Sequence, residues 1–516
     1  MRRRTNARQA RGRQKPEAKR RKPGERLIVV SNRLPYAFRR GGDGRMRAEP
    51  ASGGLVTALR PVLRDRGGVW IGWGGTTVPV REIAASLNAA SAEAGYTLAA
   101  VPLAADQVRD FYLGFSNEIV WPLFHDMPSV CNFEPRYWRT YCAVNAQYAR
   151  AVHAAAEASD LVWVHDYHLM NVAEELRALG NRSRLAFFLH IPFPPPDLFF
   201  KLPWRRALLR ALLRYDLVGL QTVRDRRNFV ACVRAMAPEV RLAGKGNVVR
   251  ARSVSGVTHI GSFPISIDYA AFRRRAAEPD VADKAAELHR LLPRRKIVLG
   301  VDRLDYTKGI PERLRAFQHL LGRYPEMRGR VSLIQVVVPS REDIPQYHQL
   351  RNEIERLVGE INGAYARPGG WVPVWYEYRS LSRIELFAYY RAADIALVTP
   401  LKDGMNLVAK EYCACSIEED CVLILSEFAG AAQQLKGALL VNPFDVEGVA
   451  EAIREACEMP ASRRAARMRQ MRRSIQRQDV YAWVDGFLRE AVRQGGAAYP
   501  RLRSPGTVDA EEQLPL

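Results

Sequence analysis

Short apolar segments alternate with longer amphipathic segments along most of the chain. Nearly continuous apolar runs are typical of parallel strands buried on both faces, whereas an apolar period of 3.6 residues is typical of surface helices. The predicted strands of the first half are Leu27–Val30, Val69–Ile71, Leu161–Val164, Leu185–His190 and Leu217–Leu220. Those of the second half are Ile297–Val301, Val331–Val337, Val372–Tyr376, Ile395–Thr399 and Val422–Leu425. This pattern predicts an α/β protein with parallel sheets covered by helices.

The series of strands and helices occurs twice, and 516 residues are more than one hydrophobic core usually serves. We therefore predict two Rossmann-like, doubly wound domains that face each other across a cleft. The expected N-terminal domain spans residues 26–262 and the C-terminal domain spans residues 263–494, with Phe263–Ala271 as the linker. A last amphipathic helix at about 480–493 can pack on either domain, the N-terminal one included. Residues 1–25 and 495–516 are expected to be disordered tails.

The formal charge of +23 is spread unevenly along the chain. Residues 1–26 hold twelve Lys or Arg and two Glu, which gives this segment a net charge of +10. Such a segment can bind polyanions weakly or can be only a solvated tail, and the lack of aromatic residues within it favours the tail. The rest of the chain is also basic, as expected of a protein that handles phosphorylated substrates.

The cysteines and the apolar runs indicate the compartment. Seven cysteines are scattered without a C-x-x-C pair, and the spacing of Cys413 and Cys415 suits neither zinc nor a disulfide. No apolar run approaches the roughly 20 residues that cross a bilayer, and no apolar segment of a secretory signal follows the basic N-terminus. We therefore expect a cytoplasmic protein with reduced thiols.

The segment Leu401–Tyr412, with the sequence LKDGMNLVAKEY, carries the strongest functional signal. It follows an apolar run and predicts the end of a strand, a loop and the start of a helix. The backbone N–H groups of Met405, Asn406 and Leu407 are expected to be free donors at that helix start, which attracts an anion such as diphosphate. Glu411, about two turns into the helix, can accept hydrogen bonds from the vicinal hydroxyls of a ribose. The two features together predict a nucleotide-sugar site.

Cationic side chains follow two other predicted strands of the second half. Arg303 and Lys308 are expected on a loop after Ile297–Val301, where they can bind the same dianion. Fixed cations favour the transition state of transfer because the leaving diphosphate gains charge there. Two solvated surface cations are the alternative interpretation. Arg341, after Val331–Val337, is a further cation at a strand end.

Polar residues follow the predicted strands of the first half as well. Arg33 comes after the first strand and is suited to bind two phosphate oxygens. A Gly- and Arg-rich loop follows it, and then Gly53 and Gly54, which allow a backbone to come close to phosphate or sugar. We interpret Asp166 as an acceptor for sugar hydroxyls and His190 as a group that lines the reaction centre. The alternative is that both side chains only satisfy loop backbone.

Two motifs are missing from the sequence. There is no G-x-x-x-x-G-K-[ST] segment, so a P-loop nucleotide site is not supported. We also find no strand-end D-x-D of the kind that holds a divalent metal on a diphosphate. His165 and His168 have the spacing of metal ligands, but no third ligand stands at a suitable spacing. We therefore predict no metal site and no cofactor, and expect cationic side chains and a helix start to act on the diphosphate.

In this order, these segments closely resemble the trehalose-6-phosphate synthases, which are retaining glycosyltransferases of the two-Rossmann GT-B fold. The resemblance covers about residues 27–486. In the first half it rests on SNR at 31–33, SGGL at 52–55, FSN and WP-x-FH across 115–125, HDYHL at 165–169 and FFLHIPFP at 187–194. In the second half it rests on RLDY-x-KG at 303–309, SR at 340–341, DGMNLVAKEY at 403–412 and EFAGAA at 427–432.

The resemblance implies that glucose 6-phosphate binds against the N-terminal domain and UDP-glucose, or another nucleotide diphosphate glucose, against the C-terminal domain. The residues that it implies for the acceptor are Arg33, Tyr112, Trp121, Asp166 and Arg341. Those that it implies for the donor are Gly53, Gly54, Arg303, Lys308, Leu381, Asp403, Leu407, Val408 and Glu411. The catalytic residues that it implies are His190, Arg303, Lys308 and Asp403. Leu381 stands where family members often carry Phe, so the preferred base stays open.

The reaction that the resemblance implies gives α,α-trehalose 6-phosphate and UDP, the first step of trehalose biosynthesis, without a metal. We expect substitution on one face of the sugar, because no carboxylate is evidently placed as a nucleophile, and we expect a homo-oligomer. One alternative is a relative of the glucosylglycerol-phosphate synthases, which use ADP-glucose and glycerol 3-phosphate. Another is a non-catalytic sensor of sugar phosphates, against which the intact Arg303, Lys308, Asp403 and Glu411 argue.

Overall fold

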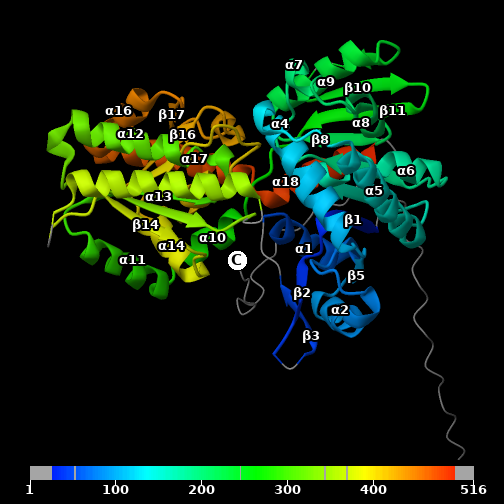
Figure 1. The fold of residues 1–516 in the computed structure, drawn as a ribbon, viewed down its shortest axis with the longest axis horizontal. Coiled ribbons are helices and arrows are strands. Elements are labelled where there is room, and N and C mark those ends of the chain that lie inside the picture. The colour runs from blue at the N-terminus through cyan, green and yellow to red at the C-terminus, as the bar shows by residue number, and fades with distance from the viewer. Residues whose placement is uncertain are drawn as a thin grey trace, which may run out of the picture.

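Two layered α/β units lie side by side along the long axis of the protein (Figure 1). The computed structural model describes residues 26–42, 44–50, 54–244, 246–341, 344–367 and 370–493. The predicted tails lie outside these residues. Each unit has its own sheet, and helices cover both faces of it. Among the described helices, none is both long enough and apolar enough to span a bilayer.

The N-terminal unit is built on a nine-stranded sheet. Its strands in spatial order are β5 (Thr97–Ala100), β4 (Gly68–Trp73), β1 (Leu27–Arg33), β6 (Leu161–His165), β7 (Arg184–Phe188), β8 (Leu217–Leu220), β11 (Gly256–Ser262), β10 (Val248–Ser253) and β9 (Arg241–Ala243). The strands from β5 to β11 are parallel, and β10 and β9 continue the sheet antiparallel. The strand order reverses at β1, so the crevice for a ligand is expected beside the carboxyl end of that strand.

The C-terminal unit is built on a six-stranded sheet in which every pair is parallel. Its strands in spatial order are β14 (Val374–Tyr378), β13 (Val331–Val338), β12 (Lys296–Arg303), β15 (Ile395–Val398), β16 (Val422–Ser426) and β17 (Leu439–Val441). The order reverses between β12 and β15, which places the second crevice at their carboxyl ends.

Helices pack on both faces of each sheet. In the N-terminal unit they are α1 (Gly54–Arg66), α2 (Val80–Ala94), α3 (Ala105–Gln107), the π-helix η1 (Val108–Val120), α4 (Trp121–Phe124), α5 (Pro135–Ala155), α6 (Val172–Ala178), α7 (Pro196–Phe199), α8 (Arg205–Leu212) and α9 (Val223–Met236). In the C-terminal unit they are α10 (Tyr269–Ala276), α11 (Pro279–Leu291), α12 (Ile310–Arg323), α13 (Pro345–Tyr365), α14 (Arg383–Ala392), α15 (Leu407–Cys415), α16 (Val446–Glu458) and α17 (Ala461–Arg477).

Strand β1 illustrates why its apolar run is continuous. Leu27 and Val29 point into one hydrophobic cluster, and Ile28 and Val30 point into another on the opposite face of the sheet. Both faces are therefore removed from water, and each position needs an apolar side chain. The first of these clusters continues into the C-terminal unit, so the two units share part of their core.

The last helix, α18 (Val480–Arg493), leaves the C-terminal unit and packs on the N-terminal one (Figure 1). The Phe487 ring stacks on Trp163 with centroids 4.4 Å apart, and Trp483 lies edge-on to Phe188. Arg184 donates to the Ala491 carbonyl at 2.6 Å. The chain therefore joins the units twice, once at residues 263–268 and once before α18.

Each of the ten predicted strands has a counterpart, but several boundaries differ. The predicted strand Leu185–His190 ends at Phe188, and β14 begins after Pro373, which has no N–H to donate to a ladder. Arg303 was expected on a loop, and this was wrong, because it is the last residue of β12 and pairs with Val338. The expected Gly- and Arg-rich loop after Arg33 is instead an antiparallel hairpin of β2 (Tyr36–Arg40) and β3 (Met46–Pro50).

Candidate active site

The carboxyl ends of the two sheets meet between the units. Polar residues at or just after those strand ends are Arg33 (β1), Asp166 (β6), His190 (β7), Arg303 (β12), Arg341 (β13) and Asp403 (β15). Direct contacts hold the two sides together. Trp121 Nε1 of the N-terminal unit donates to Asp305 Oδ1 at 3.4 Å. The polar residues at the two sets of strand ends are therefore in contact and form one site rather than two separate ones.

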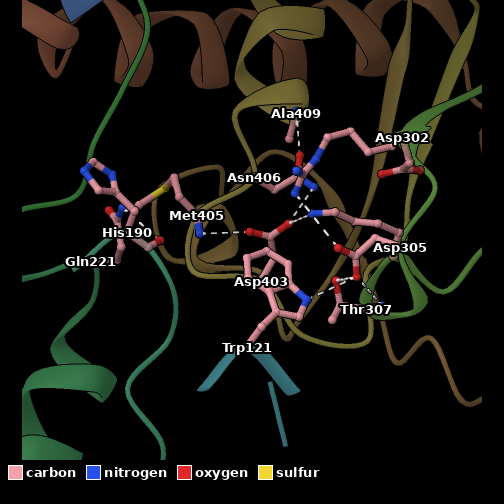
Figure 2. A network of polar contacts seen from close by, with 12 residues as sticks. Trp121, His190, Gln221, Asp302, Asp305, Thr307, Asp403, Met405, Asn406 and Ala409 are labelled. Atoms are coloured by element: carbon pink, nitrogen blue, oxygen red, sulfur yellow. Dashed lines mark hydrogen bonds and ion pairs between the residues drawn. The ribbon is translucent and has the colours of Figure 1, made fainter. Parts of the chain in front are cut away.

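Asp403 lies at the centre of the polar network on the C-terminal side (Figure 2), and it forms an ion pair with Lys308. Lys308 Nζ is 2.6 Å from Asp403 Oδ2, and the side chains are only 14% and 15% exposed. Burial disfavours the charged carboxylate, but Lys308 outweighs this effect and holds the pKa of Asp403 below its usual value. Gly309, with φ 64°, turns the chain directly after Lys308, and a Cβ there would lie 2.4 Å from the Thr399 carbonyl oxygen. The sequence Lys-Gly is thus what lets this lysine sit against β15.

The start of α15 differs from the expectation in one respect. The N–H of Met405 is not free, because it donates to Asp403 Oδ1 at 3.3 Å (Figure 2). Asn406 caps the helix, and its side-chain oxygen accepts from the Ala409 N–H at 3.1 Å. The helix therefore begins at Leu407. The N–H groups of Leu407 and Val408, its first two residues, have no carbonyl partner within the helix and remain available to an anion.

Glu411 is the fifth residue of α15, so it lies just over one turn into the helix and not two turns as expected. Its Oε2 accepts a hydrogen bond from Tyr390 at 2.9 Å. Burial raises the pKa of Glu411 to about 7, and the Tyr390 hydrogen bond only partly offsets this shift. A ligand that donates hydroxyl hydrogen bonds to this carboxylate would favour its charged form.

Arg341 is locked in place where the two units meet. Its guanidinium is 7% exposed, donates to the Tyr347 hydroxyl at 2.7 Å and lies 3.4 Å from Asp305. It also covers the Trp121 ring at 4.2 Å and reaches the Tyr167 hydroxyl of the other unit at 3.4 Å. Although burial disfavours the charge of Asp305, Arg341 and its neighbouring cations hold the pKa of that carboxyl below its usual value.

Arg303 is the more available of the two arginines on this side. Its side chain is 49% exposed, 4.0 Å from Asp305 and 5.8 Å from the centre of the Trp121 ring. Arg303, Arg341 and Trp121 therefore surround the same carboxylate. The cluster has a surplus of positive charge directed toward the space between the sheets.

Arg33 lies on the N-terminal side and is exposed. Its guanidinium sits 4.9 Å from the Trp73 ring and 5.3 Å from the Tyr112 ring. Tyr112 in turn stacks on His168, with centroids 5.8 Å apart. Burial lowers the pKa of His168 well below its usual value, as do the charges of Arg341 and Arg33. A neutral ring below a flat cation leaves the guanidinium edge free to bind phosphate oxygens.

Asp166 and His190 follow β6 and β7 and contact each other at the strand ends of the N-terminal unit. Asp166 has the unusual φ of 72°, and its Oδ1 accepts from the His190 backbone N–H at 3.2 Å. Burial raises the pKa of Asp166 to about 7 and lowers that of His190 to about 3. His190 Nε2 and His165 Nδ1 are 3.2 Å apart, so one ring donates and the other accepts. His190 therefore stays neutral at physiological pH.

The remaining predicted residues fall in three places. Gly53 lies outside the described residues, and Gly54 is the first residue of α1. The Leu381 side chain is buried in the core beside α14, which leaves only its backbone for a ligand.

The predicted absence of a metal site concerned His165 and His168. In the part of the chain that the structure describes, no group of three or more His, Cys, Asp or Glu side chains is arranged to hold a metal ion.

Several residues of the site were not singled out from the sequence. His125 Nδ1 donates to the Trp121 carbonyl at 2.7 Å, and burial lowers the pKa of His125 to about 4. Tyr167 and Tyr347 accept hydrogen bonds from Arg341. Asn406 was expected only as a backbone donor, but its side chain also donates to Asp403 at 3.2 Å. His125 and Tyr167 stand inside segments already recognised as motifs, so position within a motif was the available signal. Tyr347 is on α13, and nothing in the sequence connects it with the site.

Comparisons with known proteins show the family of this chain. The model of Glycosyltransferase family 20 matches residues 25–493. The trehalose-6-phosphate synthase of Mycobacterium avium is 43% identical over 476 residues, which cover 91% of this chain and 96% of that protein. A bifunctional trehalose-6-phosphate synthase/phosphatase of Thermoproteus tenax is also 43% identical, over 90% of this chain and 63% of that protein.

Solved structures give the same result. An α,α-trehalose-phosphate synthase (UDP-forming) from Burkholderia xenovorans, in complex with glucose-6-phosphate, has a TM-score of 0.81 and 35% identity, and the match covers 90% of this chain and 100% of that one. A structure from E. coli bound with UDP-2-fluoro glucose also has a TM-score of 0.81 and 35% identity, over 90% of this chain and 98% of that one.

Proposed function

The chain belongs to glycosyltransferase family 20, and from this premise we propose that it transfers glucose from UDP-glucose to glucose 6-phosphate. The products are α,α-trehalose 6-phosphate and UDP, with the configuration at the transferred carbon retained. One observation carries the proposal. Cations stand at the strand ends of both sheets, Arg33 on the N-terminal side and Arg303, Lys308 and Arg341 on the C-terminal side, close to where neutral His190 and half-buried Asp166 lie.

We propose that the donor binds at the C-terminal side. Lys308 and Arg303 would bind its diphosphate, together with the N–H groups of Leu407 and Val408 at the start of α15. Glu411 would accept from the ribose hydroxyls. Asp403 already accepts from Lys308, Met405 and Asn406. Its remaining lone pairs suit the hydroxyls of the glucose unit better than attack on carbon.

We propose that the acceptor binds at the N-terminal side. Arg33 would bind the phosphate of glucose 6-phosphate from above the aromatic rings of Trp73 and Tyr112, and Arg341 would approach it beside Trp121. Asp166 would accept from the sugar hydroxyls. Its pKa of about 7 suits a carboxyl that hydroxyl donors convert to the charged form.

The chemistry that fits this arrangement is substitution on one face of the sugar. The bond between the anomeric carbon and the diphosphate breaks, and an oxocarbenium-like sugar forms. The anomeric hydroxyl of glucose 6-phosphate then bonds to the same face while its proton passes to the departing phosphate oxygen. Lys308 and Arg303 favour this step because charge grows on the diphosphate as it leaves. Orientation of the two substrates accounts for about 7–11 kcal/mol of the barrier in such reactions.

The test is a product assay with the purified protein. UDP-, GDP- and ADP-glucose are each offered with glucose 6-phosphate or with glycerol 3-phosphate, and the product is identified by mass spectrometry and NMR. We expect α,α-trehalose 6-phosphate from UDP-glucose, and we expect a chelator such as EDTA to leave the rate unchanged. Glucosylglycerol phosphate as the main product would instead assign the chain to the glycerol-phosphate branch.

Three further expectations stay predictions. These are self-association of the chain, a location in the cytoplasm, and weak binding of polyanions by residues 1–25, which lie outside the described residues. Sedimentation analysis addresses the first, cell fractionation the second, and binding of heparin with and without residues 1–25 the third.

A further inference from the structure

A surface pocket of about 600 Å³ lies beside α17, on the C-terminal unit. Its volume falls in the range of small-molecule sites, about 300–1,000 Å³. The residues that line it are Gln434, Lys436, Ala466, Arg469, Gln470, Arg473, Ser474, Arg477 and Gln478. None of them belongs to the predicted donor or acceptor site.

The wall formed by α17 is strongly cationic. The helix holds seven arginines and no acidic residue. Arg469, Arg473 and Arg477 follow one another at four-residue intervals, so they share one side of the helix and span about 12 Å along its axis. Lys436 adds a fourth cation to the same pocket. Like charges one turn apart repel each other, and a bound anion would remove that repulsion.

The other arginines of α17 are occupied. Arg464 pairs with Asp420 at 2.7 Å, Arg463 with Glu455 at 3.4 Å, and Arg467 donates to the Gly437 carbonyl at 2.8 Å. Arg472 is buried against α15, where it binds carbonyls at the end of that helix.

The cations of the pocket are largely without acidic partners. Within the residues described by the structure, no carboxylate lies within 4.0 Å of the charged groups of Arg473, Arg477 or Lys436, whereas Arg469 pairs with Glu419 at 3.4 Å. The unpaired charge of α17 is therefore concentrated in the pocket.

The pocket also adjoins both segments that join the two units. Gln434 Oε1 accepts from Lys410 Nζ at 2.7 Å, and the same Nζ donates to the Ile265 carbonyl in the linker at 2.6 Å. Lys410 is 1% exposed and precedes Glu411 on α15. The Gln434 amide also donates to Gln478, directly before α18. The N–H of Val480, two residues on, donates to the linker carbonyl of Ile267 at 3.0 Å.

We propose that this pocket binds a small anion that carries two or more phosphate groups, and that its occupancy changes donor affinity through Gln434 and Lys410. Guanidinium groups bind phosphate oxygens in pairs, and a row of three suits a ligand with several phosphates better than a single one. Movement of Gln434 reaches the linker and α15 through the buried amino group of Lys410. The binding site stands on the pocket alone, whereas the effect on donor affinity rests on the proposed function.

Calorimetric titration with inorganic tripolyphosphate tests the site. We compare the full chain, the double variant Arg473→Gln/Arg477→Gln and the control Arg463→Gln/Arg356→Gln, all at one ionic strength. Arg463 and Arg356 are exposed arginines of the same unit that pair with Glu455 and Glu360. We expect the pocket variant to lose about tenfold or more in affinity, while the control stays within about twofold of the wild type. Equal titration curves for all three proteins would overturn the site.

Kinetics test the coupling. Tripolyphosphate at concentrations that saturate the pocket is expected to change the KM for UDP-glucose by about threefold or more in the wild type. The change should disappear in Arg473→Gln/Arg477→Gln, and also in Gln434→Met, whose affinity for the anion is measured by the same titration. Gln478→Met serves the same purpose if Gln434→Met does not fold. An identical response in all variants would mean that tripolyphosphate acts only at the donor site, which overturns the coupling.

The two proposals fail in different ways. If the chain does not form trehalose 6-phosphate, the proposed function is wrong, but the calorimetric comparison still decides the anion site. If the chain forms the product and the pocket variant binds tripolyphosphate like the wild type, only the anion site is wrong.

Discussion

Both sides of the candidate active site carry cationic side chains, but the two sides differ in how far neighbouring carboxylates neutralise these cations. On the C-terminal side, Lys308 is paired with Asp403 at 2.6 Å, and Arg341 is buried against Asp305. On the N-terminal side, Arg33 is exposed and rests on the rings of Trp73 and Tyr112. Apart from Arg303, which is 49% exposed, the C-terminal cations are therefore paired with carboxylates before any ligand arrives, whereas the N-terminal side presents a cation whose partner must come from the substrate.

This difference predicts different kinetic roles for the two sides. Charge that develops in a transition state is best stabilised by groups that need no reorganisation, which describes Lys308 and its carboxylate. A phosphate that only anchors a substrate can be bound by a more exposed cation, because the interaction is equal in the ground and transition states. We therefore expect changes on the C-terminal side to act on kcat and changes on the N-terminal side to act on KM.

Replacing Lys308 by Ala is the strongest test of this contrast. The variant loses a cation next to the leaving diphosphate, so we expect kcat to fall by about 10²–10³-fold, with little change in the KM for glucose 6-phosphate. Lys296→Ala is the matched control, because it breaks a 2.7 Å pair with Asp394 at the other end of β12. Steady-state kinetics are measured on both variants. A near-normal kcat in Lys308→Ala would contradict the assignment of kcat effects to the C-terminal side.

Replacing Arg33 by Leu tests the other side. Hydrogen bonds to charged groups contribute about 1.5–3 kcal/mol, so we expect the KM for glucose 6-phosphate to rise by about 10–100-fold. The KM for UDP-glucose should not change. Arg39→Leu, an exposed arginine on β2 that pairs with Glu49, is the control. Equal effects on both substrates would mean that Arg33 does not belong to one side only.

Replacing Gly404 by Ala tests the contact between the sides. A Cβ at this position would lie 2.4 Å from the His190 carbonyl oxygen, so the units must separate slightly. We expect a loss of about 1–3 kcal/mol in stability, as is typical of overpacking, and a lower kcat/KM for both substrates. Gly363→Ala, in α13 with nothing within 4 Å, is expected to stabilise the protein. Thermal unfolding and steady-state kinetics are compared for the two variants. Unchanged stability and kcat/KM in Gly404→Ala would refute the close contact between Gly404 and the His190 carbonyl.

The pH dependence of donor binding gives a smaller and more specific effect. The pKa of Glu411 is raised to about 7 by burial, so the carboxyl is mostly neutral below that pH and charged above it. Ribose hydroxyls donate better to the charged form, so the KM for UDP-glucose should fall several-fold as the pH rises through about 7. Kinetics across this range check the trend. The side chain of Gln in Glu411→Gln cannot titrate. If the KM for UDP-glucose depends on pH in this variant as it does in the wild type, another group is responsible.

Removal of residues 1–25 is expected to have the smallest effect. The described residues 26–493 include both sheets and all predicted site residues except Gly53. We therefore expect kcat/KM to stay the same, and only retention on heparin to weaken. Lost glucose transfer in the shortened protein would show that this segment contributes to the site.

Prediction from the sequence worked best where an element is defined by its own residues. The ten strands were found because most of them are short apolar runs buried on both faces, as Leu27–Val30 illustrates, although β14 is only partly buried. The partly buried hairpin of β2 and β3 was missed, since its burial pattern is mixed and gives no apolar run. The helix start near Asn406 was placed correctly only within a residue or two. The sequence does not show which N–H groups are already bonded to side chains such as Asp403 and Asn406.

The sequence by itself determined which groups gather at the strand ends, because strand period, glycine positions and motif order are local properties of the chain. Only the tertiary structure decided which of these groups are already paired. Lys308 and Asp403 are 95 positions apart, and Trp121 and Asp305 are 184 apart. The charge state of a buried group depends on its distant neighbours and on the water that they exclude, so the pKa values near 7 at Asp166 and Glu411 follow from the burial that the folded chain creates.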